Sequence, residues 1–213
     1  MRVPAIIFDC DGVLADSEGA SAEAWTTTLA KSGYQLTTEE FRRFIGTTDR
    51  ELADTFANAL DTTAEFLLKL AEAEMRRVLA NGLEPFPDAI RLLDRVDGHP
   101  VAVASNSERW RLDCVLASAG LSGRFAVSVA SDEVTAPKPD PAVYLRAAAL
   151  LGVAPSECVV IEDSPTGIAS ARRARMRVVA VDRGHFPRSE IGDADWVVKS
   201  LDALVGEGFS AFS

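Results

Sequence analysis

The sequence has few of the residues that most often carry catalysis or crosslinks. Of its 213 residues, two are histidines, His99 and His185, and three are cysteines. Cys10, Cys114 and Cys158 show no CxxC spacing, so we expect buried free thiols in a reducing compartment. One histidine precedes a proline and the other lies in a glycine-rich segment. We therefore assign neither histidine a catalytic role.

Positive charge and long apolar runs are also scarce. Lys and Arg number 22 against 32 Asp and Glu, which gives a formal net charge of -10. This balance argues against nucleic acid and anionic membranes as partners, because neither would be attracted electrostatically. No apolar run approaches the roughly 18 residues of a membrane span, and the N-terminal run is too short and too soon acidic for a signal peptide. We expect a cytoplasmic protein without a membrane partner.

The apolar residues that are present follow the rhythm of an α/β fold. Hydrophobic residues make up 47% and charged residues 25% of the chain, which are ordinary globular values. Strand-like apolar runs occupy residues 3–8, 101–105, 126–130, 159–162, 178–181 and 196–199, with helical patterns between the later ones. Because these runs are continuous rather than alternating, both faces of each strand should be covered. The pattern predicts a doubly wound, Rossmann-like parallel sheet.

Residues 17–84 break this rhythm with helical signals only. Thr37 with Glu40, and Thr48 with Glu51, have capping-box spacing. One helix face carries Phe66, Leu67, Leu70, Ala71, Met75, Val78 and Leu79. We predict a core domain of residues 1–16 and 85–213 and an inserted α-helical cap domain of residues 17–84. An insert after the first strand lies above the carboxyl ends of the strands and can act as a lid.

Polar residues gather at the predicted carboxyl ends of the strands. They are Asp9 and Asp11, then Ser105, Asn106 and Ser107, then Lys138, and finally Glu162 and Asp163. Many acids without histidine favour a hard cation bound by oxygen, above all Mg²⁺, with open positions for a phosphate oxygen. Lys138 and the backbone N–H groups of residues 105–107, at a helix start, supply positive potential for a phosphoryl group.

The spacing of the first two acids indicates unequal roles. Asp9 and Asp11 are two residues apart at a strand end, so their side chains point to one face. We expect Asp9 to act as the nucleophile that accepts the phosphoryl group. Asp11 would protonate the leaving alcohol and then activate water, while Gly12 lets the chain turn sharply after them.

Four segments in order resemble the signature motifs of the haloacid dehalogenase superfamily. These are FDCDGVLADSE, the SNS triplet, KPDP and IEDSPTGIASARRA. The helical insert is similar to the cap of the subgroup that contains phosphoglycolate phosphatase and β-phosphoglucomutase, and the resemblance covers nearly the whole chain. It implies a Mg²⁺-dependent phosphatase that hydrolyses a small organic phosphomonoester through an aspartyl-phosphate.

The resemblance also implies roles for single residues. Asp9 would be nucleophile and metal ligand, and Asp11 would be acid and base with its backbone carbonyl on the metal. Ser105 and Lys138 would hold the phosphoryl oxygens, Asp163 would bind the metal directly or through water, and Glu162 would bind or orient it. In the cap, FIGTTDRELA resembles the segment that reaches into the site, with Gly46 at a bend and Arg50 over the substrate.

Two departures from the family pattern stand out. Relatives often carry a histidine after DSE that assists the catalytic acid in the mutase, whereas here Ser21 stands there. A serine cannot carry that proton chemistry at neutral pH, which favours hydrolysis over the alternative of a phosphosugar mutase. The Gly-Met pair that often follows the last motif is here Arg175 and Met176, so a left-handed turn would carry a side chain.

Other functions remain as alternatives. A 2-haloacid dehalogenase of the same superfamily would need neither a metal nor a second acid, and Asp11 and Asp163 argue against it. A phosphoaccepting signalling module would be shorter, would lack a cap and would carry its acceptor on a later strand. We expect a small phosphorylated molecule as the substrate and a monomer or a weak homodimer.

Overall fold

One parallel sheet forms the centre of the protein. The computed structural model describes residues 5–45, 47–96 and 98–207, and within them six strands are ordered β3-β2-β1-β4-β5-β6, each parallel to its neighbours. The strands are β1 (Ala5–Phe8), β2 (Val101–Ala104), β3 (Val127–Val129), β4 (Cys158–Glu162), β5 (Arg177–Val181) and β6 (Trp196–Val198). Each predicted strand is confirmed, and its described ends differ from the prediction by at most one residue. Residues 3 and 4 lie outside the described residues.

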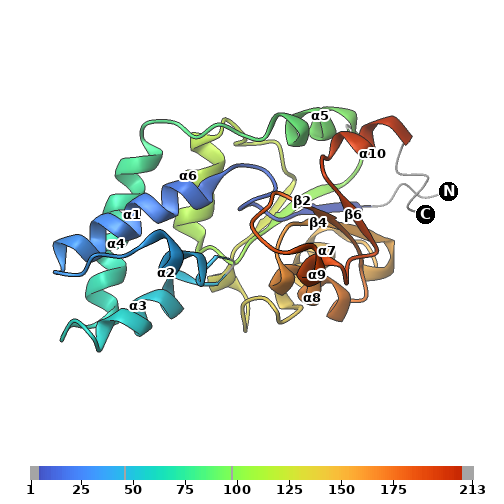
Figure 1. Ribbon diagram of the computed structural model, residues 1–213. Helices are drawn as coiled ribbons and strands as arrows, with labels where there is room; N and C mark the ends of the chain where they lie inside the picture. The colour runs from blue at the N-terminus through green and yellow to red at the C-terminus, as the bar shows by residue number, and fades with distance from the viewer. Residues whose placement is uncertain (1–4, 46, 97, 208–213) are drawn as a thin grey trace.

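Helices cover both faces of the sheet and a helical part lies to one side (Figure 1). The helices are α1 (Ser17–Lys31), α2 (Thr38–Arg42), α3 (Asp49–Ala57), α4 (Ala64–Leu79), α5 (Pro87–Arg95), α6 (Arg109–Ser118), α7 (Ala142–Leu151), α8 (Pro165–Arg173), α9 (Arg188–Ile191) and α10 (Asp202–Glu207). In Figure 1, α5 and α10 lie on one side of the sheet and α7 and α8 on the other. The doubly wound α/β fold is thereby confirmed.

The strand residues alternate between two cores. Ile6 and Phe8 pack into the cluster that includes Leu92 of α5. Ala5 and Ile7 pack into the opposite cluster, which includes Tyr144 of α7. Successive side chains of a strand point to opposite faces, so a sheet covered on both sides requires every residue to be apolar. This is why the strands appear in the sequence as unbroken apolar runs.

The helices α1 to α4 have a third core of their own. It is built from buried side chains that include Trp25, Leu29, Phe41, Phe56 and Leu67. The α2 capping box predicted from the sequence forms in full, and the side chain of the α3 cap accepts a hydrogen bond from the main chain three residues on. A separate core is consistent with a separately packed insert, and the boundaries at 17 and 84 stay predictions.

The apolar face of α4 differs from the predicted one at its first residue. Leu67 and Met75 are buried, but Phe66 is 55% exposed. The buried side chains recur every four positions, at Leu67, Ala71, Met75 and Leu79. Phe66 precedes Leu67 by one residue and therefore lies about 100° away from these side chains around the helix axis. The expected packing of Phe66 is therefore wrong. After α8, Arg175 has φ of 59°, so the left-handed turn carrying a side chain is confirmed.

No helix of the described residues has the length and apolar character needed to cross a bilayer. β1 lies between β2 and β4 in the middle of the sheet. The chain order reverses there, and the ends of these three strands form the edge where open α/β sheets bind ligands.

Candidate active site

The first acid of the site follows the central strand. Asp9 comes directly after β1, its N–H donates to the Ile161 carbonyl at 2.9 Å, and it is 6% exposed. Lys138 reaches it from the loop after β3, with Nζ at 2.5 Å from Asp9 Oδ1 and 2.8 Å from Glu162 Oε1. Burial, with the charges of the neighbouring acids, raises the pKa of Asp9 well above its usual range, and the Lys138 charge opposes this rise. The single buried ammonium therefore does not balance the carboxylates around it.

Asn106 fixes the backbone that carries this lysine. Its Oδ1 accepts from the Lys138 N–H at 2.7 Å, and its Nδ2 donates to the Lys138 carbonyl at 3.3 Å. The side chain thus clamps one residue from both sides. The sequence placed Asn106 near the phosphoryl site through its backbone N–H, and the structure adds this side-chain role in positioning Lys138.

Glu162 is buried and has both carboxylate oxygens occupied. Oε1 accepts from Lys138 Nζ and from the Tyr144 hydroxyl, the latter at 2.8 Å. Oε2 accepts from the Asp163 N–H and from both the N–H and the hydroxyl of Ser164, at 2.9 to 3.0 Å. Burial raises the pKa of Glu162, but Lys138 and the hydrogen bonds outweigh it and lower the pKa below its usual value. Glu162 is held as an ionised anchor for Lys138.

Asp163 follows β4 and completes the cluster. It is 6% exposed, and burial is the main cause that raises its pKa to about 6. Asp9, Glu162 and Asp163 each offer a carboxylate oxygen, and these three atoms lie within 4.8 Å of one another. Hard oxygen donors at this spacing suit Mg²⁺. Because Glu162 is already fully hydrogen-bonded, the side chains best placed to bind the ion are Asp9 and Asp163.

Asp11 has surroundings of a different kind. Its carboxylate accepts hydrogen bonds from the hydroxyls of Ser17, of Ser105 at 3.1 Å and of Ser107 at 3.0 Å. The guanidinium of Arg111 lies 3.7 Å from Asp11 Oδ1. Burial raises the pKa of Asp11, but Arg111 and the three hydroxyls together lower it below its usual value. Two acids with one residue between them thus have pKa values displaced in opposite directions.

Sequence reasoning missed Arg111, which lies in the first turn of α6. It is 8% exposed, and its Nη1 donates to the two oxygens of Asp49 at 3.0 and 2.9 Å. The carboxylates raise the pKa of Arg111 despite its burial. Asp49 begins α3, so Arg111 connects the helical insert with Asp11. The sequence feature that could have indicated a role for Arg111 is its position soon after the SNS triplet, which follows a predicted strand.

Two further residues at this edge were given no role from the sequence: Glu18 was not considered, and His185 was assigned no catalytic role. His185 follows β5, and its Nδ1 lies 3.5 Å from Asp163 Oδ2. Glu18, in the DSE segment, is partly buried, and burial with the charge of Asp11 raises its pKa to about 7. His185 could have been placed at the site from the sequence, because it follows a predicted strand whose carboxyl end lies on the same edge as the other strand ends.

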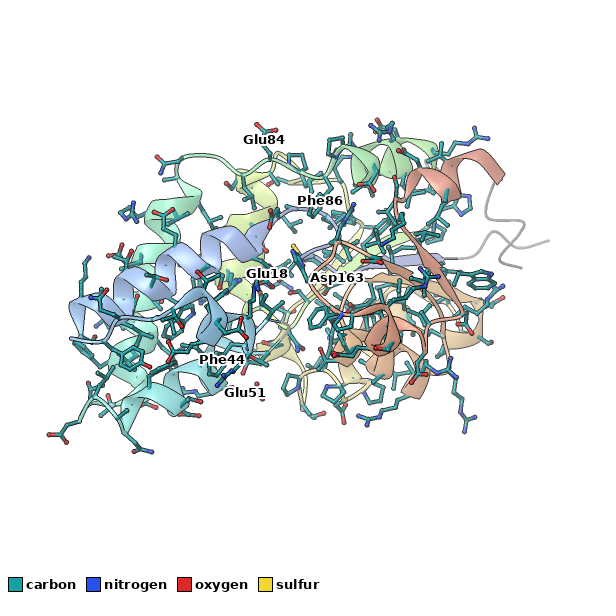
Figure 2. The ribbon with its side chains drawn as sticks, in the orientation of Figure 1. Glu18, Phe44, Glu51, Glu84, Phe86 and Asp163 are labelled. Atoms are coloured by element: carbon teal, nitrogen blue, oxygen red, sulfur yellow. The ribbon has the colours of Figure 1, made fainter. Side chains whose placement is uncertain are left out.

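A cavity of about 350 Å³ lies between these acids and the helical insert. Its sheet side includes Asp9, Asp11, Lys138 and Asp163, and its helical side includes Glu18, Phe41, Phe44 and Arg50. Figure 2 shows Glu18 and Asp163 near each other where the helical part meets the sheet. Arg50 is exposed and pairs with Glu65 at 2.9 Å. Gly46, predicted at the bend of this segment, lies outside the described residues.

The fold and this cluster define an α/β enzyme with an acidic site at the carboxyl edge of a parallel sheet. Residues 6–181 match the family described as haloacid dehalogenase-like hydrolase. Fructose-1-phosphate phosphatase YqaB of Escherichia coli strain K12 is 33% identical over 186 residues, which cover 84% of this chain and 97% of that protein. The chain therefore belongs to the haloacid dehalogenase-like hydrolase family.

A longer relative and a solved structure agree with this assignment. Protein SUPPRESSOR OF QUENCHING 1 of Arabidopsis thaliana, a chloroplastic protein, is 35% identical over 188 residues, which cover 84% of this chain but 18% of that protein. This chain thus spans less than a fifth of that relative's length. The crystal structure of CbbY from Rhodobacter sphaeroides in complex with phosphate matches with a TM-score of 0.87 and 25% identity, covering 95% of this chain and 96% of CbbY.

Proposed function

We propose that the protein is a Mg²⁺-dependent phosphatase that hydrolyses a small organic phosphomonoester, such as a sugar phosphate, through a phosphorylated Asp9. The observation that carries the proposal is the contact of Lys138 with Asp9 at the floor of the cavity, 2.5 Å between Nζ and Oδ1. A carboxylate with a cation beside it can approach an anionic phosphoryl group without prohibitive repulsion. The named activity of YqaB, which acts on fructose 1-phosphate, supports the same class of substrate.

Two steps account for the hydrolysis. In the first, an Asp9 oxygen attacks phosphorus, the bond from phosphorus to the leaving oxygen breaks, and Asp11 gives that oxygen a proton. In the second, Asp11 takes a proton from a water molecule, whose oxygen attacks phosphorus. The bond to Asp9 then breaks and inorganic phosphate leaves. Lys138, the Ser105 hydroxyl and the Asn106 N–H would bind the phosphoryl oxygens. The expected contribution of the other two N–H groups is wrong, because the Ser105 N–H donates to the Val129 carbonyl at 3.0 Å and the Ser107 N–H donates to Ser105 Oγ at 2.9 Å.

The environment of Asp11 favours one of these steps in the substrate-free enzyme. Its lowered pKa keeps the carboxylate ionised, as the water-activating step requires. The first step requires a protonated Asp11. A phosphoryl group entering beside it adds negative charge, which raises the pKa of the carboxyl and allows the proton to bind.

The donor set fits a magnesium ion. Asp9 and Asp163 would hold it with their side chains and Asp11 with its backbone carbonyl, while Glu162 orients Lys138. The bound ion would supply positive charge that offsets the repulsion between the phosphoryl oxygens and the carboxylates. Residues 17–84 would act as the cap over the site, with Gly46 at a bend and Arg50 over the substrate, and cap closure would exclude water.

Hydrolysis is favoured over isomerisation by the neighbourhood of Ser21. Its buried hydroxyl lies 3.5 Å from Arg111 Nη1, and a hydroxyl cannot exchange a proton with a sugar at neutral pH. The assay that separates the two reactions supplies a hexose 1-phosphate with a catalytic bisphosphate. Free phosphate as the main product supports the phosphatase, and a hexose 6-phosphate as the main product contradicts it.

The nucleophile is tested with Asp9→Asn on a panel of sugar phosphates, phosphoglycolate and nucleotides with Mg²⁺. We expect a loss of at least about 10⁴-fold in kcat, because the amide is a poor nucleophile for phosphorus. Asp113→Asn is the matched control, since this acid is exposed on α6 and pairs with Arg109. A phosphatase in which Asp9→Asn turns over at the wild-type rate would show that Asp9 is not the nucleophile.

A further inference from the structure

A second cavity lies behind the reaction pocket. It measures about 250 Å³ and is lined mainly by α1, α4 and α6. The residues that line both cavities are Ser21, Asp49, Glu108 and Arg111. The two spaces are therefore neighbours that share one wall.

The centre of this wall is a buried ion pair. The Arg111 side chain is 9% exposed, and its Nη1 bonds both oxygens of Asp49 at 3.0 and 2.9 Å. On the reaction side, Arg111 Nη2 lies 3.7 Å from Asp11. On the far side, the Trp25 indole N–H, from a residue that lines only the second cavity, donates to Asp49 Oδ1 at 2.8 Å. Contacts thus run from Asp11 through the ion pair to Trp25.

The second cavity has the chemistry of a site for a neutral, hydroxylated group. Its lining includes the indoles Trp25 and Trp110 and the acids Glu65 and Glu72. Each of these acids pairs with an arginine, Arg50 at 2.9 Å for Glu65 and Arg76 at 2.8 Å for Glu72. The other charged residues of the lining outside the shared ion pair, Lys69 and Glu108, have opposite signs. Aromatic faces with carboxylate acceptors bind hydroxyl-bearing groups, and this balance leaves little net charge to attract a second phosphate.

We propose that the Arg111–Asp49 ion pair determines substrate length, because it closes the reaction pocket at a short leaving group and excludes a longer hydroxylated one from the second cavity. This inference rests on the proposed phosphatase function. Arg111 is the buried member of this pair, and separating it from the partly exposed Asp49 would leave its charge uncompensated, so the pair acts as a fixed wall. Both residues are specificity determinants, one from each side of the junction between α3 and α6.

The test compares kcat/KM for trehalose 6-phosphate with that for glycerol 3-phosphate. Both probes undergo the same chemistry at Asp9, so the ratio of the two values cancels any effect of Arg111 on Asp11. The double variant Arg111→Ala with Asp49→Ala should raise the long-to-short ratio at least about 10-fold, since steric selection in a pocket is worth about 10- to 200-fold. An unchanged ratio in an active double variant overturns the proposal.

Further variants keep the result decisive. If the double variant fails to fold, Asp49→Ala alone provides the test. It removes only the partly exposed member of the pair, so it should raise the ratio by a smaller factor. Arg111→Lys retains the charge but loses the planar guanidinium that reaches both Asp49 oxygens, so it should raise the ratio by less than the double variant does. In the double variant, Leu68→Trp should fill the second cavity and reverse the gain, because Leu68 lines that cavity only.

The matched control is Arg109→Ala on the same helix. Arg109 pairs with Glu133 at 2.6 Å and lines neither cavity. Arg109→Ala removes an ion pair of α6 but leaves the Arg111–Asp49 pair in place, so the long-to-short ratio of kcat/KM should not change. A rise equal to that of the double variant would contradict the proposal. If the wild type releases phosphate from compounds of the panel above but the double variant, while active, shows an unchanged long-to-short ratio, only this inference fails. If the wild type releases phosphate from no compound of that panel, the phosphatase function fails and this inference fails with it.

Discussion

At the scale of single residues, the site depends on two carboxylates that the protein treats differently. Asp9 is held against Lys138 among other acids, whereas Asp11 is surrounded by serine hydroxyls and faces Arg111. The spacing in FDCDG is enough to predict that both acids reach one edge. The opposite displacement of their pKa values could not be predicted, because apart from Ser17 and the two acids themselves the side chains that cause it lie 94 or more positions away in the chain.

The Asp163 carboxylate leaves no space for a side chain at position 12, which is a glycine. Gly12 has φ of +77°, and a Cβ there would lie 2.0 Å from Asp163 Oδ2. We expect Gly12→Ala to displace the Asp163 carboxylate and to lower kcat/KM by at least about 100-fold, the usual consequence of a shift near 1 Å in a site. The measurement is steady-state phosphate release together with a Mg²⁺ titration, which should show weaker binding of the metal.

Gly33 provides the control for this substitution. It has φ of +90°, and no atom lies within 4 Å of its Cβ position. Gly33→Ala therefore carries only the backbone strain of a left-handed residue, about 1–2 kcal/mol. Both variants should lose thermal stability, but only Gly12→Ala should lose metal affinity. Equal losses of activity in the two variants would refute the role assigned to Gly12.

At the scale of elements, a buried ion pair joins segments that are distant in sequence. Asp88 of α5 accepts from Arg183, after β5, at 2.9 and 3.0 Å and from the Leu201 N–H, before α10, at 2.9 Å. The Arg183 side chain also donates to the carbonyls of Gly12 at 3.1 Å and Val13 at 3.3 Å. Arg183 and Asp88 thus connect the loop that follows β1 with α5 and with the end of β5.

Removing the charge of Asp88 should loosen this junction. We expect Asp88→Asn to cost about 1.5–3 kcal/mol at pH 7, the range for hydrogen bonds to a charged group. For a chain of this size this lowers Tm by roughly 4–10 °C. The exposed acid Asp202, which pairs with Arg91 at 2.7 Å, provides the control. Asp202→Asn should lower Tm by less.

The same variant has a defined pH dependence. Burial raises the pKa of Asp88, but Arg183 and the main-chain hydrogen bond outweigh it, so the folded pKa is below the unfolded value of about 3.9. The stability from the ionised Asp88 is therefore fully present above that unfolded pKa and is lost as pH falls through the folded pKa. Unfolding by denaturant at several pH values should show wild type and Asp88→Asn converging below about pH 4. A gap that stays constant down to pH 2 would contradict the assignment.

The sequence predicted elements better than it predicted contacts between them. Continuous apolar runs identified the strands because residues such as Ile6 and Ile7 must both be buried. Local signals also predicted the α2 cap and the left-handed turn at Arg175. The partners of Arg111 were not predictable, because a charged residue in a helix more often faces water. Its partners Ser21 and Asp49 lie 90 and 62 positions away in the chain, and no local pattern encodes their approach.

At the scale of the whole molecule, negative charge is concentrated at the site as well as on the surface. The chain has a net charge of -10, and four of its acids, Asp9, Asp11, Glu162 and Asp163, lie at the site with two buried cations, Lys138 and Arg111. Like charges in a small space destabilise the folded state unless a cation offsets them. A cation bound by these acids would therefore stabilise the folded state.

This stabilisation predicts a large effect of Mg²⁺ on thermal unfolding. A ligand that binds only the folded state at 100 times its Kd adds about 2.7 kcal/mol, which for a chain of this size raises Tm by roughly 5–10 °C. The rise should be reversed by a chelator and strongly reduced in Asp163→Asn, because that carboxylate is one of the two proposed side-chain ligands. Asp94→Asn removes an exposed acid that pairs with Arg124, so it should keep the full rise and exclude a general effect of lost charge. Calorimetry at fixed ionic strength, with Mg²⁺ replaced by Na⁺ in the reference, measures the effect. Equal Tm values in the two salts would show that these acids do not form a magnesium site.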